Sequence, residues 1–124
     1  MDVTPLIPQG KRIIKKYGNG SFLVNDDYYK GNIIVSPDSV IPWQINNNTE
    51  ISFDSLKSLT NQTNKIDILL IGCGNEHIKA PKELIIEFMK LGISAEMMTT
   101  GAACRTYNVL LSEERRVAAA LIAV

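Results

Sequence analysis

The sequence has no excess of charge of either sign. Its 124 residues include 13 Lys and Arg and 13 Asp and Glu, so the formal net charge at pH 7 is zero. Proteins that bind nucleic acid or anionic membranes through their overall field carry a basic excess, so we expect no nucleic-acid partner. Hydrophobic residues make up 45% of the chain and charged residues 21%. This ordinary globular balance excludes a disordered tail, a collagen-like rod and a coiled coil.

Cysteine and histidine are scarce. The chain has one histidine and two cysteines, Cys73 and Cys104, which lie far apart in the sequence and form no CxxC motif. These residues cannot complete a four-ligand zinc site without carboxylates, so we predict no metal site. Two widely separated cysteines are typical of reduced thiols in a cytosolic protein. We therefore expect free thiols and a bacterial or archaeal cytoplasm.

Long apolar runs are also missing. The longest, Val117–Val124, has eight residues, whereas a membrane-spanning helix needs about 20. The first residues include the acidic Asp2 and lack both a basic region and an apolar core, so we expect no secretory signal. The sequence predicts a cytoplasmic chain with no transmembrane segment, organised as one domain over residues 1–124.

The first half of the chain has the features of β-structure. Gly18-Asn19-Gly20 lies between short apolar segments and predicts a hairpin, because glycine and asparagine tolerate positive φ. Pro37 and Pro42 confine the segment between and after them to a sheet edge or an extended cover. We expect strands over residues 12–17, 21–24 and 28–36, a second turn at 25–27, and an edge segment over 40–45.

The second half alternates between strands and helices. Ser52 predicts a cap for a short helix over 53–60, and Pro81 and Gly92 bracket a helix over 81–91. A third helix begins at Thr99 or Thr100. The expected buried faces of the last two helices are Leu84, Ile85, Phe88 and Leu91, and then Ala103, Tyr107, Leu110 and Leu111. Strands are expected over 67–71, 93–98 and 117–124, the last one central because it is apolar on both faces. This order predicts an α/β sheet with helices on both faces and the hairpins attached.

Two loops follow sheet strands and form the candidate site. Gly72-Cys73-Gly74 begins like a dinucleotide fingerprint, but His77 stands at the third glycine position and the next helix begins only near Pro81. The glycines either let the chain leave the sheet sharply or line a cleft at the carboxyl end of the strand.

The second loop, Thr99–Arg105, joins a strand to a helix. Its backbone N–H groups, its hydroxyls and Arg105 are suited to an anion; alternatively the threonines cap the helix and Arg105 pairs with a carboxylate such as Glu96 or Glu114. Adjacent parallel strands would bring the two loops together. The candidate binding set is Gly72, Cys73, Gly74, Thr99, Thr100, Cys104 and Arg105, with no cofactor.

No catalytic constellation can be assembled from the sequence. His77 lies in a polar loop, and Tyr107 falls on the inward face of a helix. There is no Ser-His-Asp set, no pair of catalytic carboxylates and no P-loop, so we predict that the protein is not an enzyme. One alternative is thiol chemistry at Cys104, because a helix N-terminus and Arg105 would both lower its pKa.

The chain resembles the Mth938-domain family over about residues 5 to 124. The resemblance rests on residues 14–22, 31–37, Trp43, 69–74, 92–93 and 98–100, and above all on 102–111 and 114–121. Two departures are Ser21, where the hairpin pair of the family usually has a second glycine, and Cys73, where the family often has threonine. The second departure argues against a redox role for Cys73.

The resemblance implies a three-layer α/β fold: a central mixed β-sheet flanked by helices, with an added N-terminal β-hairpin layer. It implies no catalytic activity. Mitochondrial relatives act in the assembly of respiratory complex I, the NADH:ubiquinone oxidoreductase. The leading hypothesis is therefore a non-enzymatic binding or assembly protein whose partners are other proteins, among them complex I subunits or assembly factors, with peripheral association with membrane complexes.

A binding protein should present an exposed apolar patch, for which Trp43, Phe53 and residues 37–42 are the expected positions. The alternative hypothesis is a binding protein or enzyme for an anionic small molecule, held in a cleft between the Gly72–Asn75 and Thr99–Arg105 loops.

Overall fold

The N-terminal part folds as a three-stranded antiparallel sheet. The computed structural model describes residues 11–61 and 65–124. Strands β1 (Ile14–Gly18), β2 (Ser21–Val24) and β3 (Asp27–Lys30) lie in that order. Asn19 and Gly20 form the first turn with φ of 53° and 73°. Positive φ at both positions is the geometry that matches the twist of a two-residue hairpin, so the predicted hairpin is confirmed.

The single strand predicted over residues 28–36 is wrong. It is two strands, because β3 ends at Lys30 and β4 (Ile33–Val35) joins a different sheet. Gly31 has φ of 84° and turns the chain between them. Asn32 then holds the junction: its side-chain oxygen accepts from the Ala123 N–H at 2.8 Å, and its amide donates to the Ile45 carbonyl at 3.1 Å.

The central sheet has five strands and mixed direction. Its order is β5 (Val40–Pro42), β4, β8 (Val117–Leu121), β6 (Ile68–Gly72) and β7 (Ser94–Met98). The β8–β6 and β6–β7 pairs are parallel, whereas β4 pairs antiparallel with both β5 and β8. Every residue of β8 is buried, so its predicted central position is confirmed, as is the edge position of β5.

The helices begin and end where the sequence predicts. Helix α1 (Lys82–Lys90) follows Pro81, and Gly92 comes after it with φ of 77°. Helix α2 (Thr100–Ser112) has Thr99 as its N-cap, whose hydroxyl accepts from the Ala102 N–H. The helix predicted over 53–60 is the 3₁₀ helix η2 (Asp54–Asn61), preceded by the short 3₁₀ helix η1 (Asn48–Glu50). The Ser52 hydroxyl accepts from the Ser55 N–H at 3.2 Å.

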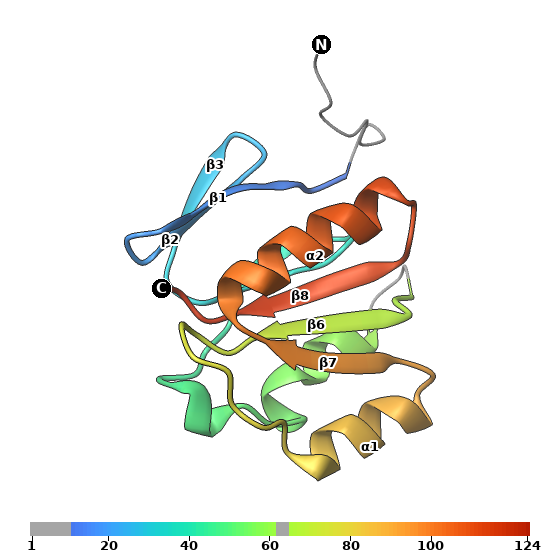
Figure 1. Cartoon of the computed structure of the whole chain (residues 1–124). Helices are drawn as coiled ribbons and strands as arrows, with labels where there is room; N and C mark the ends of the chain where they lie inside the picture. The colour runs from blue at the N-terminus through green and yellow to red at the C-terminus, as the bar shows by residue number, and fades with distance from the viewer. Residues whose placement is uncertain (1–10, 62–64) are drawn as a thin grey trace.

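Alternating residues of the sheet belong to two separate cores. Leu70 and Ala119 face α2 and the β1–β3 sheet, whereas Leu69, Ile71 and Ala118 face α1 and η2. Figure 1 shows α2 along one face of the sheet with the β1–β3 sheet beside it, and α1 on the other face. The predicted three-layer α/β fold with a mixed central sheet is confirmed, and its added layer has three strands rather than one hairpin.

Several apolar residues lie elsewhere than predicted. Leu91 is 52% exposed because it caps the end of α1 instead of lying on its buried face. Trp43, expected on an exposed patch, is buried, and its indole donates to the Ser55 hydroxyl at 3.3 Å. Phe53 is half-buried against Phe88, with ring centroids 4.9 Å apart. The predicted apolar patch is therefore wrong at Trp43 and Phe53.

Candidate functional site

The two candidate loops meet, as predicted. Gly72 pairs with Met98 at the ends of the parallel strands β6 and β7. The Cys73 N–H donates to the Met98 carbonyl at 2.9 Å, and the Thr100 N–H donates to the Gly74 carbonyl at 2.9 Å. The junction forms where the carboxyl ends of β6 and β7 reach the start of α2.

The side chain of Thr100 holds this junction together through two hydrogen bonds. Its hydroxyl accepts from the Gly74 N–H at 3.0 Å and donates to the Ile122 carbonyl at 2.7 Å. The side chain is 0% exposed. One hydroxyl thus connects the segments that follow β6 and β8 to the first turn of α2. The interpretation of Thr100 as a structural residue accounts for both of its hydrogen bonds.

The junction is packed instead of open. Gly72, Cys73, Thr100 and Cys104 are buried, Gly74 and Thr99 are half-buried, and Arg105 is exposed. The N–H groups of Thr100, Ala102 and Ala103 at the start of α2 already have partners, which are the Gly74 carbonyl, the Thr99 hydroxyl and the Thr99 carbonyl. A helix start binds anions through free N–H groups, so the geometry leaves Arg105 as the main feature of the predicted anion site. Anion binding there stays a prediction.

Arg105 does not pair with either expected carboxylate. Its Nη1 donates to the Tyr17 hydroxyl at 3.0 Å, and within residues 11–61 and 65–124 it forms no ion pair. Gly101 lies under this contact, since a Cβ there would be 2.7 Å from the Tyr17 hydroxyl. The expectation of Glu96 or Glu114 as partner is wrong, because α2 presents Arg105 towards β1.

Two further side chains of α2 bind β1 and the residues just before it. The Asn108 side-chain oxygen accepts from the Ile14 N–H at 3.0 Å, and its amide donates to the Ile14 carbonyl at 2.7 Å. The Tyr107 hydroxyl donates to the Arg12 carbonyl at 2.7 Å. Together with the Arg105–Tyr17 contact, these bonds fasten the β1–β3 sheet to α2. Sequence reasoning missed Tyr17 and Asn108; a signal for the second was an asparagine inside a helix, where its propensity is poor.

Burial determines the protonation state of the two potential nucleophiles on α2, Tyr107 and Cys104. Tyr107 is 1% exposed, and burial raises the pKa of its phenol despite the nearby Arg12 guanidinium. The phenol is therefore neutral and acts as a hydrogen-bond donor in the core, as predicted. Burial also raises the pKa of Cys104 from 9.0 to about 12, and Arg105 offsets this only in part. The predicted lowering of the Cys104 pKa is wrong because desolvation exceeds the attraction of Arg105.

We expect slow reaction of the Cys104 thiol in the folded protein. The rise in pKa from 9.0 to about 12 reduces the reactive thiolate at pH 8 roughly a thousandfold. Both cysteines are free and buried. Alkylation with iodoacetamide, followed by mass spectrometry of the Cys104 peptide, should therefore be fast only in denaturant. Rapid modification of folded protein at pH 8 would contradict this assignment.

The raised pKa of Cys104 predicts how the stability of the protein changes with pH in the alkaline range. Above pH 9.0 the Cys104 thiol ionises in the unfolded chain, but the folded protein keeps it protonated up to about pH 12. The unfolded state then binds fewer protons, so the Cys104 contribution to stability falls as pH rises through this window.

Arg105 substitutions separate a recognition role from a structural one. Because Arg105 is exposed, Arg105→Ala and Arg105→Lys should change the free energy of unfolding by about 0.5 kcal/mol or less. If the loop binds anions, inorganic phosphate should raise the melting temperature of the wild type but not of Arg105→Ala. If phosphate raised the melting temperature of both proteins equally, Arg105 would not be part of the anion site.

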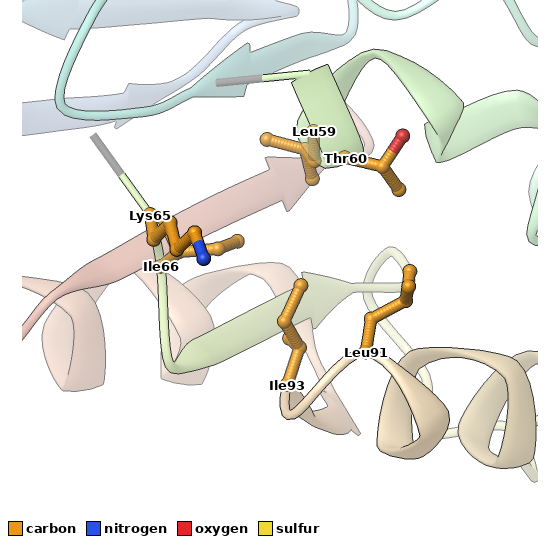
Figure 2. A pocket seen from close by; sticks show the side chains of 6 residues that line it. All are labelled: Leu59, Thr60, Lys65, Ile66, Leu91 and Ile93. Carbon is orange, nitrogen blue, oxygen red and sulfur yellow. The ribbon is translucent and has the colours of Figure 1, made fainter. Parts of the chain in front are cut away.

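Two of the hollows in the described part of the chain lie beside α1 or the residue that ends it. One is a cavity of about 230 Å³. Figure 2 shows its lining, in which Leu59, Ile66, Leu91 and Ile93 are joined by the polar Thr60 and Lys65. A second hollow of about 290 Å³ lies between α1 and β7. Neither brings acid–base pairs together. Within the described part of the chain, no group of three or more His, Cys, Asp or Glu is arranged to hold a metal ion.

Comparison with known proteins identifies the family. Residues 14–122 match a family described as a protein of unknown function, DUF498/DUF598. The chain belongs to this family. An uncharacterized protein of Rhodobacter capsulatus is 38% identical over 109 residues, which cover 88% of this chain and 82% of that protein. A solution structure from Bordetella pertussis, described as a Mth938-like domain, is 25% identical with a TM-score of 0.83, covering 99% of this chain and 92% of that one. The resemblance to the Mth938-domain family is confirmed.

Relatives of this DUF498/DUF598 protein include named assembly factors. The Drosophila melanogaster protein named NADH dehydrogenase (ubiquinone) 1 alpha subcomplex assembly factor 3 is 40% identical over 113 residues, covering 89% of this chain. The Xenopus tropicalis protein of the same name is 33% identical over 88% of this chain. The chain spans 58% and 60% of the length of these two relatives. Among the described residues, no helix combines the length and the apolar character that crossing a bilayer requires.

Proposed function

We propose that this protein is a non-enzymatic binding protein that assists the assembly of respiratory complex I, the NADH:ubiquinone oxidoreductase. The observation that carries the proposal is its 40% identity to the Drosophila melanogaster assembly factor over 89% of the chain. A match over this share of the chain supports a shared scaffold and a similar kind of partner.

The chemistry of the described residues also favours binding over catalysis. Cys104 and Tyr107 are buried and protonated at neutral pH, and the Thr100 hydroxyl is used twice within the fold. His77 is exposed on a loop. A catalytic nucleophile needs an activating base and access to substrate, and these residues are arranged for stability.

A surface suited to protein partners lies on α1. Ile86, Met89 and Leu91 are 49%, 66% and 52% exposed. Ile86 and Met89 are three positions apart and share one side of α1, whereas Leu91 follows the end of the helix. Exposed apolar side chains gathered on one element are typical of protein-binding surfaces. This surface replaces the one expected at Trp43 and Phe53.

The proposal is tested in the organism that encodes the chain. A tagged copy expressed at its natural level should co-purify with complex I subunits, identified by mass spectrometry. Deleting the gene should lower the amount of assembled complex on native gels, and a plasmid copy should restore it. The amount of succinate dehydrogenase serves as the control and should stay unchanged. Normal complex I in the deletion strain, with no subunits co-purifying, would refute the proposal.

A further inference from the structure

Strand β7 is an open edge of the central sheet. It is the last strand in the order β5-β4-β8-β6-β7, and Figure 1 shows it at the margin of the sheet. The Ser94 N–H donates to the Asp67 carbonyl at 2.8 Å, and the Met98 carbonyl accepts from the Cys73 N–H at 2.9 Å. Backbone groups alternate in direction along a strand. The N–H and C=O groups of Ala95 and Met97 therefore point outward, away from β6.

The two edges of the sheet differ in how strongly they are protected against pairing with a further strand. The edge strand β5 has three residues, ends at Pro42 and follows Pro37. Strand β7 has five residues, contains neither proline nor lysine, and pairs with β6 in unbroken register. Proteins usually block exposed edges with proline, charged side chains or bulges. The β7 edge has no proline and no bulge, and its one charged side chain is Glu96, which is compatible with pairing by a strand of complementary charge.

The surroundings of β7 match the two faces of an added strand. On the α1 side, the hollow of about 290 Å³ is lined by Ile85, Met89, Gly92, Ile93, Ser94 and Ala95. On the other side, α2 lies chiefly over β6 and β8, and Glu96 is exposed. An added strand would point alternate side chains into the apolar hollow and towards Glu96.

The charge of Glu96 indicates which kind of strand would pair with the β7 edge. Glu96 is exposed in the middle of β7 and forms no ion pair within residues 11–61 and 65–124. A second copy, paired antiparallel so that Ala95 and Met97 of each chain bond to each other, would place Glu96 directly opposite its own equivalent. Like charges opposite each other destabilise a strand pair, whereas opposite charges stabilise it. In this register, a strand carrying lysine or arginine opposite Glu96 fits the edge better than a second copy.

We propose that the β7 edge binds an extended segment of a partner protein, which adds as a further strand with apolar residues over α1 and a basic residue beside Glu96. This inference rests on the proposed role as a protein-binding factor and names the surface that performs it. Outward backbone groups of Ala95 and Met97 supply the hydrogen bonds, and the hollow between α1 and β7 receives the apolar side chains.

Amide hydrogen exchange tests the proposal on the full chain. The probe is a blocked peptide of about ten residues that alternates valine with threonine and carries a central lysine; the control peptide has glutamate in place of lysine. At millimolar concentration the lysine peptide should slow exchange of the Ala95 and Met97 amides at least about tenfold, which is 1.4 kcal/mol. The glutamate peptide should have little effect.

Two variants sharpen this test. Glu96→Lys, a surface change, should reverse the preference between the two peptides. Met97→Pro removes an outward N–H without touching the β6 ladder and should abolish protection by the lysine peptide. The proposal is wrong if neither peptide slows exchange at Ala95 and Met97, or if Glu96→Lys leaves the preference unchanged. A wild-type dimer with these two amides protected would assign the edge to a second copy instead.

The two proposals fail separately. If complex I subunits co-purify equally with wild type, Glu96→Lys and Met97→Pro, the assembly role stands and the β7 edge is not the docking surface. If the lysine peptide protects β7 but the deletion strain assembles complex I normally, the edge binds a strand and the assembly role is wrong.

Discussion

Replacing Gly72 by alanine should lower the free energy of unfolding by about 2–3 kcal/mol, which is the upper part of the range of about 1–3 kcal/mol for forcing an extra methyl group into a packed core. A Cβ at Gly72 would be 2.9 Å from the Thr100 Cα and 3.0 Å from the Leu121 Cδ2. The first contact is with backbone, which the hydrogen bonds of Thr100 hold in place. Thermal denaturation should show a melting temperature lower by roughly 10 °C.

Gly101→Ala is the matched control for this substitution. Its Cβ would meet the Tyr17 hydroxyl at 2.7 Å, but Tyr17 is an exposed side chain that can swing away. Alanine also has a better helix propensity than glycine, so the melting temperature should hold or rise while the Arg105–Tyr17 contact is lost. If Gly72→Ala were as stable as Gly101→Ala, the tight packing of β6 against the start of α2 would be disproved.

Replacing Asn108 by alanine should cost about 2 kcal/mol, because it leaves the N–H and C=O groups of Ile14 without their side-chain partner. These two bonds, at 3.0 and 2.7 Å, join α2 to the first strand of the β1–β3 sheet. Urea denaturation should show a lower midpoint with an unchanged slope. Amide exchange at Ile14 should become faster in the variant than in the wild type.

Val109→Ala, on the exposed side of the same helix, is the control and should change stability by about 0.5 kcal/mol or less. Asn108→Asp adds a direct check of the bond polarity, since a carboxylate keeps the acceptor for the Ile14 N–H but faces the Ile14 carbonyl with negative charge. It should therefore be less stable than the wild type. Wild-type stability in both Asn108 variants would show that the Asn108–Ile14 hydrogen bonds do not contribute to holding the β1–β3 sheet against α2.

Local signals predicted most of the elements correctly. The Gly18-Asn19-Gly20 turn, the Pro81 and Gly92 boundaries of α1 and the Thr99 cap of α2 all depend on backbone preferences of a few neighbouring residues. The apolar run beginning at Val117 predicted a central strand because both of its faces must be covered. Such features are readable because their causes lie within one segment.

Non-local pairing explains the errors. By its local preference, Gly31 can either continue a strand or end it. The strand ends there because the following residues, β4, pair with β8 from Ile33–Leu121 to Val35–Ala119. Arg105 was recognised as a residue that needs a partner, but Tyr17, its partner, is 88 residues away in the sequence. Cys104 was expected to be activated by its neighbours, yet its burial beneath the β1–β3 sheet raised its pKa.

The sequence by itself determined the class of fold, the order of most of its elements and the meeting of the two loops at the ends of β6 and β7. Turn preferences and hydrophobic periodicity depend on neighbouring residues, and the meeting of the loops follows from the general geometry of parallel strands. Only the tertiary structure decided that the junction is packed, that Arg105, Tyr107 and Asn108 fasten α2 to β1, and that β7 is left open. Burial and strand partners depend on which distant segments come together, and that information is spread over the whole chain.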